Sequence, residues 1–96
     1  MAKGIEITNV QFAAARPAEV KRGLLGWVSF RLNGTLQIDG VSLRRTADGR
    51  LALSFPGRRD GMGRQRFYLR PLGDVARRKI EYQLFQALGF EEGMPR

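Results

Sequence analysis

The dipeptide Asn33-Gly34, set between two alternating segments, constrains the fold of this chain more than any other feature. Residues 24–32 place Val28 and Phe30 on one side, and the alternation resumes in residues 36–43. Asn and Gly both tolerate a positive φ, which the tight turn of a β-hairpin requires. The sequence therefore predicts an antiparallel hairpin at this point of the chain.

Further alternating segments extend this hairpin into an antiparallel, strand-rich meander of about five strands. The added strands are expected at residues 5–12, 51–55 and 64–70, with a loop at 13–22. The alternation slips at two places, as β-bulges would cause, and these are Thr8-Asn9 and Asp39-Gly40. Strand phase assigns four large aromatic side chains to the core: Trp27, Phe30, Phe55 and Phe67.

One amphipathic helix is predicted after Pro71, where apolar residues recur with a period of 3.6. Asp74 is expected to cap its N-terminus and Gly89 its C-terminus. The side chains of Tyr82 and Phe85 lie off the main stripe, where they pack on a loop or meet a second subunit. The core-facing stripe is Ala76, Ile80, Leu84, Ala87 and Leu88.

These elements predict one α+β domain over residues 1–96, a meander followed by a C-terminal helix, with frayed ends at 1–4 and 90–96. The chain has no cysteine and no histidine, so it lacks a disulfide framework, the commonest metal ligand and the usual general base. No apolar run approaches membrane-spanning length. We expect a cytoplasmic protein that is not an enzyme, with no metal, cofactor, small-molecule substrate or membrane partner.

The net charge is concentrated in one stretch of the sequence. From Arg44 to Lys79 there are eleven basic and three acidic residues, which accounts for the whole net charge of +8. The remaining residues carry six basic and six acidic side chains. A concentrated excess of this kind indicates a surface that binds a polyanion, most often nucleic acid.

The predicted strand at residues 64–70 would place part of this positive charge on one surface. Alternation places four side chains on one exposed face: Arg64, Arg66, Tyr68 and Arg70. Guanidinium groups bind phosphate through paired hydrogen bonds, and an aromatic ring beside them can stack on a base. The alternative is an ordinary solvated sheet face, in which Tyr68 packs against a neighbouring arginine.

A second group of cations lies at the start of the predicted helix. Arg77, Arg78 and Lys79 occupy its first two turns, where the helix dipole disfavours positive charge, and Glu81 can pair with Arg77 four residues earlier. A bound phosphate would resolve that conflict, because the backbone N–H groups there also point outward. The alternative is a solvated helix face.

Arg58 and Arg59 add a cationic loop tip, where Asp60 can neutralise one of them.

Three segments in order resemble the stage V sporulation protein G family, the septation regulators. They are the opening strand Ile-Glu-Ile-Thr-Asn-Val, the segment Leu-Ser-Phe-Pro-Gly-Arg-Arg at 53–59, and the run 71–80. In that run Pro71, Arg77, Lys79 and Ile80 match the family signature Pro-Ile-Asn-x-x-x-Arg-x-Lys-Ile. The resemblance spans residues 5–88.

The resemblance implies a small dimeric α+β protein that binds DNA site-selectively, and in some members RNA, to regulate bacterial gene expression, sporulation or septation. The family's loop-to-helix region is implicated in nucleic-acid contact, which carries over to Arg58, Arg59, Arg77 and Lys79. We therefore expect a homodimer that binds nucleic acid mainly through backbone phosphates. The competing interpretation is a basic adaptor that docks an acidic protein partner without touching nucleic acid.

Overall fold

The computed structural model describes residues 4–90, so the predicted fraying of residues 1–3 and 91–96 lies outside the described residues. Four strands form one antiparallel sheet in the order β1-β2-β3-β4, and β5 pairs with β6 in a second, small sheet. The elements are β1 (Ile7–Ala14), α1 (Pro17–Lys21), β2 (Leu24–Leu32), β3 (Leu36–Arg45), β4 (Leu51–Ser54), β5 (Gly57–Arg59), β6 (Gln65–Phe67) and α2 (Gly73–Leu88). The α+β prediction is confirmed.

The central hairpin and both bulges form where the sequence predicts them. Leu32 pairs with Leu36 across a turn in which Asn33 and Gly34 have φ values of 52° and 64°. The register of β1 on β2 shifts between Thr8 and Gln11, around Asn9 with its φ of 53°. The register of β2 and β3 shifts between Val28 and Phe30, where β3 contains Gly40, whose φ is 77°. A residue with a positive φ is typical of one class of β-bulge, the class that favours glycine.

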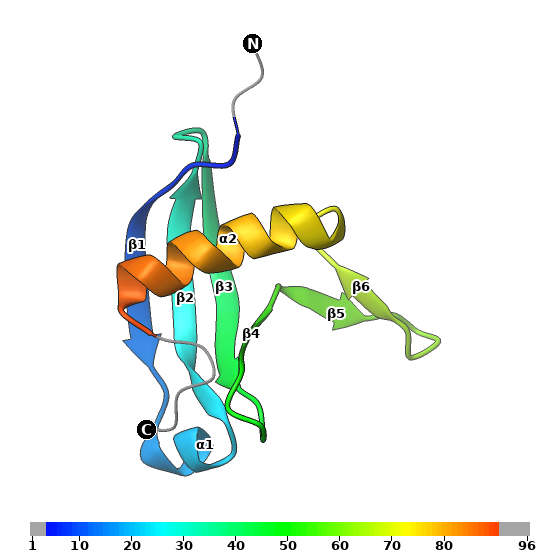
Figure 1. Cartoon of the computed structure of the whole chain (residues 1–96). Coiled ribbons are helices and arrows are strands. Elements are labelled where there is room, and N and C mark those ends of the chain that lie inside the picture. The colour runs from blue at the N-terminus through cyan, green and yellow to red at the C-terminus, as the bar shows by residue number, and fades with distance from the viewer. Residues whose placement is uncertain (1–3, 91–96) are drawn as a thin grey trace.

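Helix α2 lies across one face of the four-stranded sheet, and the core fills the space between them (Figure 1). Its last turn ends at Gly89, which has a φ of 76° and donates its N–H to the carbonyl of Phe85, as predicted for a C-cap. The buried apolar side chains are Val28, Phe30, Ile38, Val41, Leu43, Leu51, Phe55, Ile80, Leu84 and Phe85.

Two of the four aromatic core predictions are wrong. Trp27 is 40% exposed, because it follows the outward phase of β2 while Val28 and Phe30 point toward α2. Phe67 is 46% exposed, because β6 belongs to the small sheet and leaves the body of the protein. Phe85 is buried although it lies off the predicted stripe, whereas Tyr82 is exposed.

Three local predictions also need correction. Residues 17–21 form the short helix α1 instead of a loop, since Pro17 starts it and Glu19 accepts a hydrogen bond from the backbone N–H of Arg16. Asp74 does not cap α2, because Leu72 occupies the N-cap position and no side chain bonds there. The predicted strand at 64–70 is reduced to Gln65–Phe67.

Candidate nucleic-acid interface

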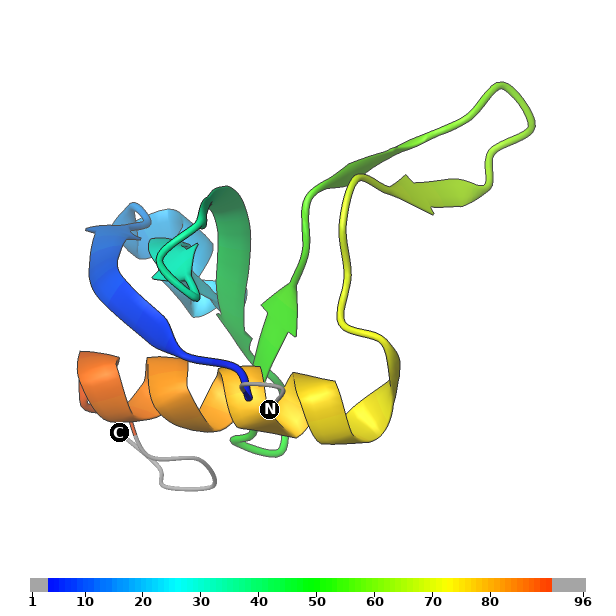
Figure 2. The same cartoon turned by 90° about the horizontal axis from the view of Figure 1, so that it is seen from above.

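Strands β5 and β6 form a two-stranded arm, residues 57–67, that projects away from the sheet and from α2 in both views (Figures 1 and 2). The arm begins directly after Pro56, which lies two residues beyond the end of β4 at Ser54. At Gly57 the two strands approach so closely that an added Cβ would lie 2.4 Å from the carbonyl oxygen of Arg66. Only glycine fits at that point, so Gly57 allows the arm to close at its base.

The pairing register distributes four arginines over the arm. Arg58 lies opposite Arg66 and therefore shares one face with it, while Arg59 lies opposite Gln65 on the other face. Like charges directly opposite each other across an antiparallel pair are destabilising. Arg58 has no ion pair within residues 4–90. The repulsion between Arg58 and Arg66 is therefore offset through the ion pair that Arg66 forms with Asp60.

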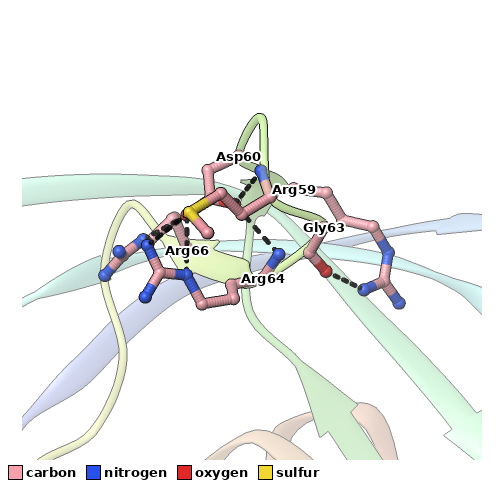
Figure 3. Close-up of polar contacts among 6 residues, drawn as sticks. Arg59, Asp60, Gly63, Arg64 and Arg66 are labelled. Atoms are coloured by element: carbon pink, nitrogen blue, oxygen red, sulfur yellow. Dashed lines mark hydrogen bonds and ion pairs between the residues drawn. The ribbon is translucent and has the colours of Figure 1, made fainter.

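Asp60 organises the tip of the arm (Figure 3). Its Oδ1 accepts the backbone N–H groups of Met62 at 2.9 Å and Arg64 at 3.0 Å. Its Oδ2 accepts the Nε–H groups of Arg64 at 3.3 Å and Arg66 at 3.0 Å. One carboxylate thus closes the turn and also holds two guanidinium groups side by side.

These donors act on the ionisation of Asp60. The backbone N–H groups of Arg64 and Met62 lower the pKa of its carboxyl below the ordinary value, and the two guanidinium groups act in the same direction. Asp60 therefore stays ionised near neutral pH. A second brace comes from Arg59, whose Nη1 donates to the carbonyl of Gly63 at 2.9 Å. The tip is held in shape by its own side chains.

Tyr68 and Arg70 follow the arm. The strand predicted to carry Arg64, Arg66, Tyr68 and Arg70 ends at Phe67, so its last two predicted members lie beyond β6. The N–H of Tyr68 donates to the carbonyl of Pro56 at 2.9 Å, which ties the two ends of the arm together. Its ring is exposed, and Arg70 borders an open apolar groove between the sheet and the first turns of α2.

Of the three predicted cations in the first two turns of α2, one forms ion pairs with described residues and two do not. Arg77 pairs with Asp74 at 3.0 Å and with Glu81 at 3.7 Å, and the hydrogen bond that Arg77 donates to Asp74 is the main cause that raises the pKa of Arg77. Arg78 and Lys79 are exposed and form no ion pair within the described residues. The predicted pairing of Arg77 with Glu81 is confirmed, and it reduces the unbalanced charge at this helix end.

One cation was missed by the site prediction. Arg50, after the β3–β4 turn, lines an open groove together with Arg77 and Arg78 of α2. Asp48 and Glu81 also line this groove, so its charge is mixed. From the sequence, Arg50 is recognisable only as one cation of the basic stretch from Arg44 to Lys79. Its position along the chain does not show that the β3–β4 turn lies beside α2.

The predicted cations gather at one end of the molecule in two groups. Both views place the arm and the first turns of α2 at the same end, with the arm directed away from the helix (Figures 1 and 2). Three of the eight cations have carboxylate partners, and two of these share Asp60. Five form no ion pair within residues 4–90: Arg58, Arg59, Arg70, Arg78 and Lys79. The end of the molecule with the arm is therefore strongly electropositive.

No known family model matches this chain, and no curated protein is similar to it. Among residues 4–90, no helix is long and apolar enough to cross a membrane. The same described residues contain no cluster of three or more His, Cys, Asp or Glu side chains that could hold a metal ion.

Proposed function

We propose that this protein binds nucleic acid, chiefly DNA and also RNA, through backbone phosphates, as a binding protein and not an enzyme. The observation that carries the proposal is the projecting arm. It places four arginines and one carboxylate on a short ribbon exposed on both faces. Arginine forks suit phosphate, and a surface of one charge sign needs counter-charge to offset its self-repulsion.

The cations of α2 support the same proposal as a second contact. Arg78 and Lys79 lie in the first turns of a helix whose N-terminus already attracts anions. In the proposed complex the arm and this helix end contact phosphates, with Tyr68 stacking on a base or packing beside them. The resemblance to the stage V sporulation protein G family suggests the setting, a cytoplasmic regulator of bacterial gene expression, sporulation or septation.

A salt titration tests the proposal. With about 4–6 phosphate contacts per dimer, affinity for random-sequence duplex should fall with salt at a log–log slope of about −4 to −5. Fluorescence anisotropy against duplex, single strand and RNA measures both the slope and the preference. Binding that is undetectable on all three near 50 mM salt contradicts the proposal. A salt-dependent pull-down that recovers the same protein after nuclease treatment would then favour an acidic protein partner.

We also propose that the chain acts as a homodimer. The outer strands β1 and β4 leave two sheet edges unpaired, and α2 exposes the apolar side chains of Leu72, Val75 and Tyr82. Open edges and exposed apolar side chains are the features that subunit contacts cover. Sedimentation equilibrium at micromolar concentration should give twice the mass of the chain. A mass equal to one chain across that range contradicts this proposal.

A further inference from the structure

The tip of the arm carries an apolar side chain that the fold does not use. Met62 is 79% exposed and lies between Gly61 and Gly63 at the end of the projecting hairpin. Within residues 4–90, the one polar contact of its side chain is a weak one, from Nη2 of Arg64 to the sulfur at 3.6 Å. A single exposed methionine is ordinary on a protein surface. What distinguishes Met62 is its position at the end of a cationic ribbon.

The turn that presents Met62 is held by many hydrogen bonds. The backbone of Asp60 forms two hydrogen bonds across the turn. Its N–H donates to the carbonyl of Arg64 at 2.9 Å, and its carbonyl accepts the N–H of Gly63 at 3.0 Å. Its carboxylate accepts two more backbone N–H groups, including that of Met62 itself. A tip whose polar groups bond to one another can enter a narrow space without leaving donors unsatisfied. The methionine is thus presented outward on a preorganised turn.

The arginines of the arm match the walls of a groove. Arg58 and Arg66 lie on one face of the ribbon and Arg59 on the other, so guanidinium groups are directed to both sides. A DNA groove has a phosphate backbone on each side, and a ribbon charged on both faces can contact both strands. In straight B-DNA the major groove is the one wide enough for such a ribbon, but the negative potential of the minor groove attracts arginine, and ribbons enter that groove where the duplex is bent and the groove widened. The minor groove of A-form RNA is wide and shallow, which fits such a ribbon poorly.

We propose that the arm enters the minor groove of duplex DNA and that Met62 wedges between base pairs at its tip, bending the duplex. Methionine is among the apolar side chains that act as wedges in minor-groove proteins, and such wedges kink DNA by roughly 20–90°. The inference rests on the proposed nucleic-acid binding and specifies its geometry. The arginines anchor the ribbon to the phosphates, and Met62 unstacks a base step.

The test is a bending measurement on a duplex of about 30 base pairs with an A·T-rich centre and a donor and acceptor dye at its ends. We expect the wild-type protein to raise energy transfer, corresponding to a bend of roughly 20–90°. Met62→Ala should lose most of this bend while affinity falls less than about tenfold, because the arginines that contact the phosphates are retained. Met62→Leu should keep the bend. Leu36→Ala, which removes a 57%-exposed side chain at the distant β2–β3 turn, should leave bend and affinity unchanged.

Groove ligands identify the site of entry. Netropsin, which occupies the minor groove, should displace the protein, whereas methyl green, which occupies the major groove, should not. A bound duplex that stays straight, an unchanged bend with Met62→Ala, or displacement by methyl green alone overturns the inference and leaves the proposed function standing. If the wild-type protein binds no duplex near 50 mM salt, the proposed function itself fails.

Discussion

In the proposed homodimer, replacing Arg58 and Arg66 together with glutamine should weaken duplex binding by more than about 1,000-fold at about 0.1 M salt. Each phosphate contact contributes about 0.9 to the log–log salt slope, so the loss of two contacts from each protomer should also reduce the slope by about 3 to 4. The arm should stay folded in this variant. The two side chains face each other across the ladder, and their exchange removes a like-charge pair while Asp60 keeps its bonds to Arg64.

A charge-matched control separates a local effect from a change in net charge. Arg22→Gln with Arg31→Gln removes the same charge from exposed positions outside the basic stretch. This control should change affinity less than threefold or so, because contacts with phosphate are local while distant charges are screened by salt. Equal weakening by both double variants contradicts the assignment of the interface to the arm. Far-UV circular dichroism of each variant confirms that the fold is retained.

Phe30→Ala should lower the free energy of unfolding by about 3–5 kcal/mol, a large fraction of the stability of a domain this size. Phe30 is buried in the core between the sheet and α2. Trp27→Ala, three residues earlier on the outward face of β2, should cost only about 1 kcal/mol. Urea denaturation followed by circular dichroism measures both variants without relying on tryptophan fluorescence. Equal losses would mean that the outward phase of Trp27 is wrong.

The main sheet was predictable because each of its signals is local. The turn at Asn33 and the slips at Asn9 and Gly40 require backbone conformations that few residues adopt, and the sequence places suitable residues there. The outward phase of Trp27 follows from the same alternation. Its assignment to the core was wrong because the phase of the strand was misjudged at this residue, which faces the side opposite to Val28 and Phe30.

The arm was not predictable, because alternation reports which side a residue faces and not whether a strand joins the main sheet. Pro56 indicates the end of a strand, but the separate ribbon depends on the close approach of Gly57 to Arg66 within one hairpin, which alternation alone does not encode. Asp60 was expected to neutralise one arginine. The structure gives it two guanidinium groups and two backbone N–H groups, a combination that only the closed turn brings together.

The helix start shows the same division between local and non-local information. The pairing of Arg77 with Glu81 follows from helical spacing, and it is confirmed. The predicted start of the helix is two residues too late, because Asp74 is a favourable capping residue whereas the observed N-cap, Leu72, has no capping side chain. The grouping of Arg50 with Arg77 depends on how α2 crosses the sheet, which no sequence spacing encodes.

The central claim is that the cationic end of the molecule, the arm together with the first turns of α2, is the surface that contacts nucleic acid. Two-dimensional NMR of the ¹⁵N-labelled protein, titrated with a short random-sequence duplex at low salt, tests this claim residue by residue. We predict that chemical-shift changes concentrate in residues 57–70 and 77–79, with the α1 end and the β2–β3 turn unaffected. Changes confined to α1, to the β2–β3 turn or to the outer face of β1 would contradict it.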